Sequence, residues 1–531
     1  MVQIARLSGE SASTRDAQAI IDEKITYYEA AIRELRTRRN IHSRISKLPT
    51  ELLSEIFVLA KLASYINTRQ GSWLNVACVC RHWRDIAVNE ARLWNTFDLT
   101  RTMELDWVKI MLTRSKDASL CIRIPPSGYE PDTVKVVMSQ ISRTQDLQIY
   151  ADNPRLWEVL EIVIAHATPN APTRLRSLEL RSTSSRLALD LVRRVFAAVQ
   201  MPLMLDLQLY GIALSTIPPM PLLRRFYYHQ TVFGFESMAM LLSSLKNTPC
   251  LEDLDIGCMF NTSDEEMIQY GPVQLPKLKT ISLTTNRFEY FSLLQCIRYP
   301  PSSLVRFESR RAPVQIADIN NFSGIVAHFA SSDVAVDISS ISLLSEAGPE
   351  LCLRLTAWIN NDPAFSIRCP VSERDALPLF NLCEMLPASK VRAFRINNFS
   401  SIKRDDWARV FRRFGQVQEL TVRFGEVALP ALLKPPNKDQ PPFLQLKQLT
   451  LINCDFDSHE ALPDFTLSVE RLLQERVDLH IPIEVLIILE CKIAGATIKR
   501  LEEYECVSWD GQTLLDDTDD SDSSDGYPMM F

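Results

Sequence analysis

The histidines, the side chains most often used for proton transfer and metal binding, are scattered along this sequence. They are His42, His82, His166, His229, His328, His459 and His480. The sequence contains no HExxH, no HxH and no cysteine partner at zinc spacing, so it offers no zinc motif. It also lacks a GxSxG nucleophile motif and a Walker phosphate-binding loop. We therefore interpret the histidines as ordinary surface or core residues and expect neither a metal nor a cofactor.

Carboxyl and thiol groups do not suggest catalysis either. The pairs Asp405-Asp406 and Glu265-Glu266 are neighbours in sequence, so their side chains point apart and are better explained as negative charge at helix N-termini. Cys78 and Cys80 form the only close pair among 12 cysteines, and we expect both inside a helix, as small apolar residues. All the cysteines are expected in apolar contexts, where a thiol is inert. We expect a non-catalytic protein; the alternative is an enzyme whose site is assembled across the folded body.

Composition limits the classes of partner. The formal net charge is −7, and a nucleic-acid-binding surface would need a basic excess, so we expect no nucleic acid. The most apolar stretch, residues 481–498, is interrupted by Glu484, Glu490 and Lys492, so we expect no membrane span. Scattered cysteines and the absence of an N-terminal apolar signal region predict reduced thiols and a cytoplasmic and/or nuclear location.

Residues 45–97 contain a dense apolar pattern that predicts three short helices. In the first, apolar residues recur at helical spacing and Pro49 suits the first turn. The apolar residues of the three helices are Leu52, Leu53, Ile56, Phe57, Leu59 and Ala60, then Leu74, Val76, Ala77, Val79, Cys80, Trp83, Ile86 and Ala87, and finally Trp94. A module of about 50 residues buries only about 60% of its unfolded surface. The surplus apolar residues therefore predict a protein partner.

The motifs LPxELLxxIF, VxxVCRxWRxIA and a closing LW strongly resemble the F-box of SCF ubiquitin ligases, and the arrangement of the whole chain resembles the large fungal F-box families. The insert between Ala60 and Trp73 is longer than in compact members, and Asn89-Glu90-Ala91 replaces a common Thr-Pro. The resemblance implies docking on a Skp-family adaptor, which joins a cullin and a RING subunit. It assigns the adaptor interface to Leu48, Pro49, Leu52, Ile56, Val79, Cys80 and Trp83. It assigns the F-box core to Leu53, Phe57, Ile86 and Trp94.

The two ends of the chain differ from the rest. Residues 1–15 are expected to be disordered, and residues 16–40 to form a helix. The helix has a seam with the spacing of a short coiled coil, at Ile21, Ile25, Tyr28, Ile32 and Leu35. Packing onto the F-box or the body is one reading of this seam, and self-association is the other. Residues 511–531 are expected to be an acidic disordered tail, either simply solubilising or with serines phosphorylated by an acidophilic kinase.

Residues 98–510 repeat a pattern of hydrophobic residues, LxxLxL, at intervals in the high twenties. The copies are Leu175-Leu178-Leu180, Met204-Leu207-Leu209, Leu223-Phe226-Tyr228, Leu251-Leu254-Ile256, Leu278-Ile281-Leu283, Val391-Phe394-Ile396, Val417-Leu420-Val422 and Leu446-Leu449-Leu451. Fainter copies are expected at Leu147-Ile149, Leu304-Phe307, Val336-Ile338, Phe365-Ile367, Val477 to Ile481 and Ile483 to Leu489. Amphipathic helices are expected at Leu187 to Val199, Glu236 to Leu245 and Trp407 to Phe414. The repeat predicts an irregular leucine-rich-repeat-like solenoid with one strand and one helix per unit.

The predicted fold class is therefore α/β: an N-terminal helix and three-helix F-box, then the solenoid and the acidic tail. The expected function is the substrate-receptor subunit of an SCF-type ligase, acting in ubiquitin-dependent degradation. The alternative is a non-degradative scaffold built on the same parts. An unknown protein substrate is expected on residues that alternate with the core leucines. The leading candidates are Gln208, Asp255, Arg395 and Arg423, with Glu179, Tyr227, Ser282 and Thr450 also considered.

Overall fold

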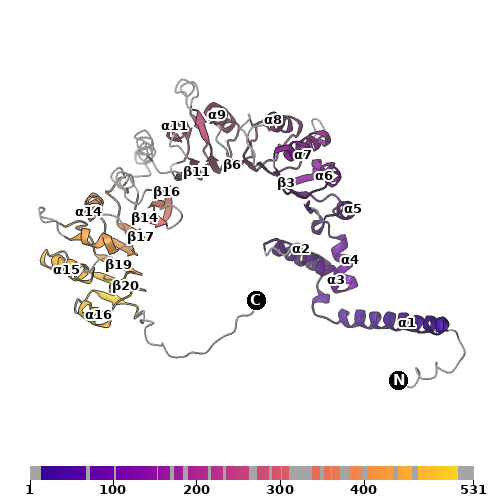
Figure 1. Cartoon of the computed structure of the whole chain (residues 1–531), viewed down its shortest axis with the longest axis horizontal. Coiled ribbons are helices and arrows are strands. Elements are labelled where there is room, and N and C mark those ends of the chain that lie inside the picture. Colours follow the sequence, from indigo (N-terminus) through magenta and orange to yellow (C-terminus); the bar gives the residue numbers. More distant parts are fainter. Residues whose placement is uncertain are drawn as a thin grey trace, which may run out of the picture. The chain divides into compact units, whose positions relative to one another are not determined.

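The computed structural model describes most of the chain (Figure 1). The chain forms two compact units. The described residues are 14–66, 72–100, 103–151, 153–167, 173–182, 189–212, 217–230, 235–261, 272–285, 290–300, 302–309, 338–346, 352–359, 361–370, 383, 386–397, 404–424, 426–433, 441–456 and 465–511. The first unit comprises residues 1–150 and 161–175, and the second comprises residues 151–160 and 176–531. The predictions of disorder before residue 14 and after residue 511 fall outside the described residues.

The first unit begins with helices and continues with a small parallel sheet. Its helices are α1 (Thr14–Ile41), α2 (Thr50–Ile66), α3 (Val76–Val79) and α4 (Arg81–Asn89), with short 3-10 turns η1 (Ile45–Lys47), η2 (Ser72–Asn75) and η3 (Ala91–Leu93). The sheet and its helices are β1 (Thr96–Asp98), α5 (Leu105–Arg114), β2 (Leu120–Ile124), α6 (Pro131–Met138) and β3 (Thr144–Ala151). Helix α7 (Asn153–His166) follows, and its residues 153–160 are assigned to the second unit. Strand β2 pairs in parallel with both β1 and β3. The repeat pattern predicted β3 but neither β1 nor β2.

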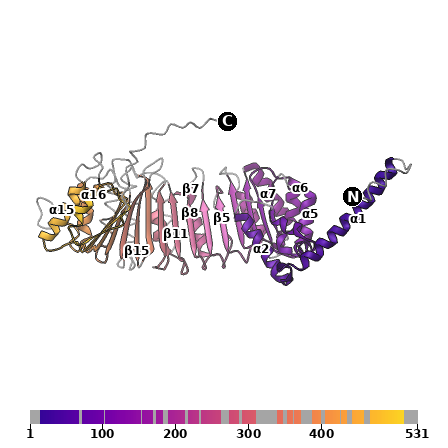
Figure 2. The ribbon, with the colours of Figure 1, turned by 90° about the horizontal axis from the view of Figure 1, so that it is seen from below.

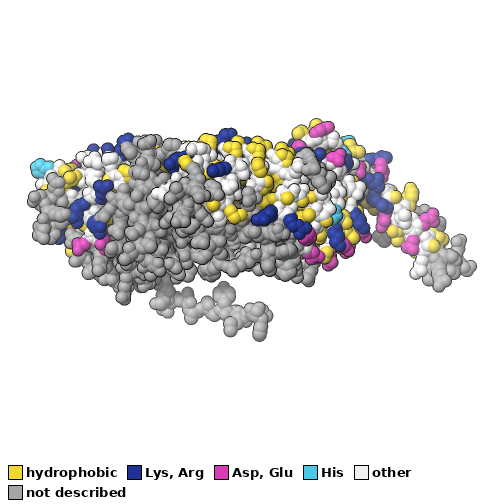
Figure 3. All heavy atoms as spheres, turned by 90° about the horizontal axis from the view of Figure 1, so that it is seen from above, with side chains coloured by type: hydrophobic (Ala, Val, Ile, Leu, Met, Phe, Trp, Pro, Cys, Tyr) yellow, Lys and Arg dark blue, Asp and Glu magenta, His cyan; other side chains and the backbone are white. Residues whose placement is uncertain are grey.

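Helix α1 carries its apolar seam on the surface. The five seam residues Ile21, Ile25, Tyr28, Ile32 and Leu35 are 47–64% exposed. Figure 3 shows hydrophobic side chains, in yellow, among the charged ones on this helix. Within the described part of the first unit, the F-box-like helices therefore do not cover this seam, and the expectation that it packs onto the F-box is wrong there. Packing onto the body stays a prediction. Self-association through this seam stays a prediction.

The second unit starts with parallel strands that follow the predicted repeat. The strands are β4 (Ser177–Ser182), β5 (Asp206–Tyr210), β6 (Arg225–His229), β8 (Asp253–Gly257), β11 (Thr280–Thr285) and β13 (Leu304–Ser309). Each pairs in parallel with the next. The connections contain α8 (Leu189–Ala198), α9 (Met238–Lys246) and α11 (Tyr290–Gln295), and two small strand pairs, β7 (Phe235–Ser237) with β9 (Met259–Asn261) and β10 (Val273–Gln274) with β12 (Ile297–Arg298).

The regular order breaks at an antiparallel meander formed by β14 (Ser340–Glu346), β15 (Cys352–Ile359) and β16 (Asp362–Pro370). The last strand of the meander pairs with β13 and the first pairs with β17 (Ala393–Asn397), so the meander enters the sheet in reverse order. The expected strand at Phe365-Ile367 lies in β16, whereas Ile338 precedes β14 and Val336 lies outside the described residues. The expected one-strand-one-helix order is therefore wrong here. Asn361, at φ 73°, belongs to the tight turn that reverses the chain between β15 and β16.

Parallel order resumes after the meander. Strands β17, β18 (Glu419–Arg423), β19 (Gln448–Ile452), β20 (Val485–Leu489) and β21 (Val507–Trp509) pair in sequence, with α14 (Arg404–Arg413), the 3-10 segment η6 (Glu426–Leu432), α15 (Phe465–Asp478) and α16 (Gly495–Leu501) between them. The expected strand copy at Val477 to Ile481 is wrong, because α15 runs to Asp478. The copy at Ile483 to Leu489 corresponds to β20.

Alternate residues of each strand in the second unit point to opposite faces of the sheet. On one face the aliphatic residues are buried against the helices: Leu207, Leu254 and Ile281, for example, are at most 1% exposed. We call the other side the open face; Figure 2 shows the strands from this side, with no described helix lying across β5, β8 and β11. The sheet is thus mixed but mostly parallel, as the α/β class predicted. None of the described helices has the length and apolarity needed to cross a membrane.

Candidate protein-interaction surface

Helix α2 is apolar on two faces. Leu53 and Phe57 point into the module and are 0% and 1% exposed. Leu52, Ile56 and Leu59 lie on a different side of the helix, and they are 51%, 41% and 61% exposed. With 3.6 residues per turn, positions 52, 56 and 59 share one stripe. We call this stripe the α2 outer face.

Aromatic rings hold the inner face in place. The ring of Trp83 on α4 lies 5.0 Å from that of Phe57, measured between centroids. Trp94 is 1% exposed, and its indole Nε1 donates a hydrogen bond of 2.7 Å to the carbonyl oxygen of Ala87. Trp107 of α5 contacts the Trp94 ring at 5.8 Å, and the Arg114 guanidinium lies 4.4 Å above it. The helical module and α5 therefore share a packed core.

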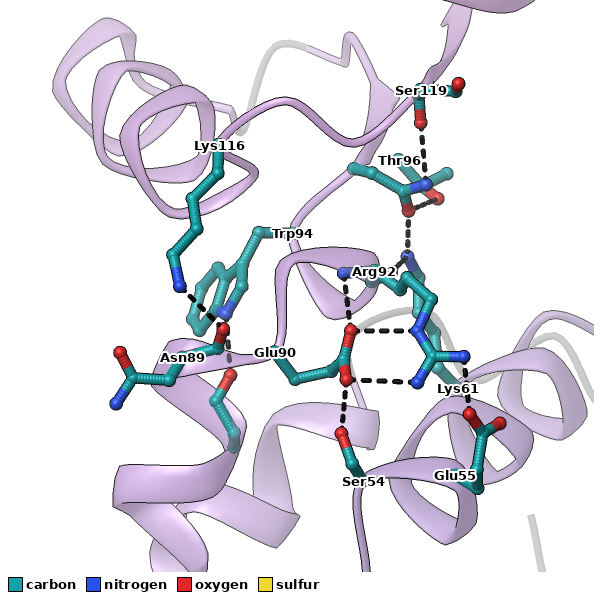
Figure 4. A network of polar contacts seen from close by, with 12 residues as sticks. Ser54, Glu55, Lys61, Asn89, Glu90, Arg92, Trp94, Thr96, Lys116 and Ser119 are labelled. Carbon is teal, nitrogen blue, oxygen red and sulfur yellow. Dashed lines mark hydrogen bonds and ion pairs between the residues drawn. The ribbon is translucent and has the colours of Figure 1, made fainter. Parts of the chain in front are cut away.

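A polar network fastens α2 to the short turn η3 (Figure 4). Ser54 donates a hydrogen bond to Glu90, whose carboxylate pairs with Arg92 at 2.9 Å and accepts a hydrogen bond from the Arg92 backbone N–H. Arg92 also pairs with Glu55 at 2.7 Å. The hydrogen bond from Arg92 is the main reason that the pKa of Glu90 is lowered to about 2. Glu90, one of the residues that depart from the family pattern, thus caps η3 and connects it to α2.

Lys61 places a buried ammonium group beside this network. The residue is 4% exposed, and its Nζ donates hydrogen bonds to the Arg92 carbonyl at 2.8 Å and to Asn95 Oδ1 at 2.9 Å. Asn95 in turn donates to the carbonyl of Ser119, ahead of β2. Burial lowers the pKa of Lys61 to about 8, because the charged form loses its hydration.

The depressed pKa of Lys61 predicts a pH-dependent stability. Below about pH 8 the ammonium is charged in both the folded and the unfolded chain; between 8 and 10.5 the folded chain releases the proton first, so folding becomes more favourable as pH rises. Denaturant unfolding of the wild type and of Lys61→Met at about pH 7 and about pH 10 measures the difference between their unfolding free energies. From the lower to the higher pH, this difference should change by about 2–3 kcal/mol in favour of the wild type. The same free-energy difference at both pH values would contradict the view that burial destabilises the charged form of Lys61.

The residues predicted for the adaptor interface fall into two groups. Pro49, Leu52, Ile56 and Val79 are exposed, whereas Leu48, Cys80 and Trp83 are half-buried. Among the predicted core residues, Leu53, Phe57 and Trp94 are buried and Ile86 is half-buried.

Two details of the thiol prediction are wrong. Cys80 is not helical: it is an extended residue, at φ −158° and ψ 172°, between α3 and α4. Cys78 is exposed at the end of α3, so its thiol is not enclosed by apolar residues. Helices α3 and α4 are separate, and an extended residue joins them. Helical periodicity in the sequence does not show where such a break falls.

Sequence reasoning overlooked three exposed apolar residues as site candidates: Ile45, Leu59 and Leu62, at 40%, 61% and 55% exposed. The helical period of α2 could have suggested Leu59, because it follows Leu52 by seven residues. For Ile45 and Leu62 the sequence alone gives no comparable signal.

The predicted substrate residues lie on the open face of the second unit. Gln208 and Asp255 belong to one cross-strand row, in which each residue stands beside its neighbour on the next strand. Arg395 continues this row beyond the meander, and Arg423 stands in the adjacent row. Glu179 and Thr450 are only 7% and 8% exposed, so they offer little surface. Among the described residues, no three His, Cys, Asp or Glu side chains converge as a metal site would require.

Comparison with protein families identifies the N-terminal helical region. Residues 45–100 match the family model described as F-box-like, and this range contains η1 to β1 and all the residues predicted for the interface and its core. The match confirms the resemblance predicted from the sequence. No curated protein matches the chain.

Proposed function

We propose that this F-box domain-containing protein is the substrate-receptor subunit of an SCF-type ubiquitin ligase. F-box domains generally bind Skp-family adaptors, and proteins that contain them are typically non-catalytic. The observation that carries the proposal is the α2 outer face, where Leu52, Ile56 and Leu59 stay exposed although the inner face of the same helix is buried. Large apolar side chains gathered on one helix face are typical of a protein interface.

In this proposal Pro49, Leu52, Ile56 and Val79 contact the adaptor directly. Each large aliphatic side chain that becomes buried contributes about 1.5–3 kcal/mol, so a few anchors suffice for stable binding. Leu48, Cys80 and Trp83 are half-buried and support these anchors from within. Trp83 does so through its ring contact with Phe57.

The second unit would hold the substrate. We propose that its strand-and-helix units stack as an irregular leucine-rich-repeat-like solenoid, interrupted by the meander, and that a protein substrate lies along the open face near Gln208, Asp255, Arg395 and Arg423. The receptor then makes no covalent bond itself. It raises the effective concentration of the substrate near the ubiquitin carrier, which the cullin and RING subunits bring.

The proposal is tested by co-purification. Leu48→Ala with Pro49→Ala should reduce recovery of a Skp-family adaptor with the full chain by about tenfold or more, because the entry into α2 loses apolar contact. Ile110→Ala is the control, since Ile110 is an exposed aliphatic residue on α5, outside the F-box-like range. Unchanged adaptor recovery from a folded double variant would refute the interface. Adaptor recovered from the wild type without any cullin would favour the alternative, a non-degradative scaffold.

A further inference from the structure

The open face carries five arginines on the strands around the meander. They are Arg306 on β13, Arg368 on β16, Arg354 on β15, Arg395 on β17 and Arg423 on β18. We call these five the arginine surface. Arg306 and Arg395 are joined in one cross-strand row by hydroxyl residues, Ser366, Thr356 and Ser342. The other three arginines belong to the neighbouring row, where Arg368 stands beside Arg354.

Positive charge exceeds negative charge at this surface. Arg306, Arg395 and Arg423 are exposed, and within the described chain neither Arg306 nor Arg395 forms an ion pair. Glu308 is the acidic neighbour within the two rows, and it pairs with Arg368 at 2.7 Å. Guanidinium groups in parallel rows suit carboxylates, because each can donate two hydrogen bonds to one acid.

The open face has the opposite character farther toward the N-terminus. Strands β4 to β8 present acidic residues, and each acid named here already has a basic partner. The pairs are Glu179 with Arg181 at 2.8 Å, Asp206 with Arg225 at 2.7 Å and Asp255 with His229 at 2.9 Å. Arg306 and Arg395, which form no ion pair within the described chain, thus lie around the meander.

An acidic segment of this same chain is attached close to the arginine surface. It contains Asp516, Asp517, Asp519, Asp520, Asp522 and Asp525. The described chain runs to Gly511, just after β21, which is three strands from β18 and four from β17. Three to four strand spacings amount to about 14–19 Å. Five residues from Gly511 to Asp516 span up to about 17 Å, so the chain is long enough for the first aspartates to reach Arg423 and for later ones to reach Arg395.

We propose that residues 516–525 bind the arginine surface of their own chain and occupy the basic part of the open face. A covalently attached segment acts at an effective concentration on the order of millimolar, so several modest ion pairs are enough to keep it bound. An acidic segment of another protein must then compete with it. Phosphate on Ser521, Ser523 or Ser524 would add negative charge and tighten the contact. This inference does not depend on adaptor binding.

The test uses a fluorescent peptide with the sequence of residues 512–526 and a chain that ends at Gly511. Fluorescence anisotropy should show binding to the shortened chain, weakened by salt, and about 10- to 100-fold weaker binding to the full chain, whose own segment competes. In the shortened chain, Arg395→Glu with Arg423→Glu should abolish binding. Arg193→Glu, an exposed arginine on α8, is the control and should bind normally.

Each other result would overturn the proposal. Equal binding to the full and shortened chains would mean that the segment does not occupy the surface, leaving it to an acidic partner. No binding to the shortened chain would mean that the arginine surface is not a site for this segment. Self-association that disappears on shortening would place the segment on a second copy. Arg395→Gln with Arg423→Gln, milder changes at exposed positions, should give the same loss if the Glu variant unfolds.

Discussion

Leu52→Glu combined with Ile56→Glu is expected to weaken binding to a Skp-family adaptor by about 100-fold or more, without unfolding the chain. Both side chains are exposed on the α2 outer face, at 51% and 41%, so the free protein tolerates charge there. In a complex the two aliphatic contributions, about 1.5–3 kcal/mol each, would be lost and two carboxylates would be buried without partners. A loss of 3 kcal/mol or more corresponds to about 100-fold in affinity.

Isothermal titration of the full chain with the adaptor measures this effect. The matched control is Ile110→Glu with Leu467→Glu, because these residues are exposed to a similar degree, 41% and 58%, on α5 and α15. If the control weakens adaptor binding as much as the α2 variant, the loss comes from added negative charge anywhere on the surface. The α2 outer face would then have no special role in binding. Full affinity in the α2 variant would remove the basis of the proposed receptor function.

The structure predicts that residues on the α2 outer face contribute more to adaptor binding than Leu48 and Pro49, the first two residues of the motif. Leu48 precedes α2 and is half-buried, so replacing it also changes the packing of the module. Part of its effect on binding is therefore indirect. Leu52 and Ile56 have no such internal role. We therefore expect the charge substitutions on α2 to affect adaptor binding more strongly than alanine at Leu48 and Pro49.

The sequence predicted the positions of the helices in the F-box-like region better than it predicted which of their apolar residues are internal and which are exposed. Helical spacing groups Leu52, Leu53, Ile56 and Phe57 into one wide apolar stripe, and only their burial, with the ring of Trp83 against Phe57, shows that Leu53 and Phe57 are internal. The resemblance to the F-box supplied that division before the structure did. Glu90 was noted only as a departure from the family, because its links to Ser54 and Arg92 depend on where η3 meets α2.

In the second unit, the strands with strong alternation were predictable and their order was not. Leu207 and Leu209, or Leu420 and Val422, are buried on one face of a strand, and this two-residue period is visible in sequence. The meander has similar alternation, but its hairpin at Asn361 reverses the direction of pairing. A count of residues between leucines cannot detect that reversal. For the same reason, the cross-strand row that joins Arg306 to Arg395 was not predictable.

Trp94→Ala is expected to destabilise the first unit by about 3–5 kcal/mol, the usual cost of removing a buried tryptophan. Trp94 is 1% exposed and contacts Trp73 and Trp107, and its indole N–H satisfies the Ala87 carbonyl. The loss leaves a cavity between the helical module and α5. Denaturant unfolding followed by tryptophan fluorescence and circular dichroism measures the change in free energy.

Trp94→Phe separates the packing of this ring from its hydrogen bond. The phenyl ring retains part of the apolar contact but leaves the Ala87 carbonyl without its donor, so we expect a smaller loss, about 1–3 kcal/mol. Adaptor affinity measured at low temperature, where both variants are still folded, should stay within a few-fold of the wild type, because Trp94 has almost no exposed surface. A folded Trp94→Ala chain of wild-type stability would contradict the packed junction. A large loss of affinity in that chain would mean that Trp94 itself reaches the partner, against the inner and outer faces assigned to this module.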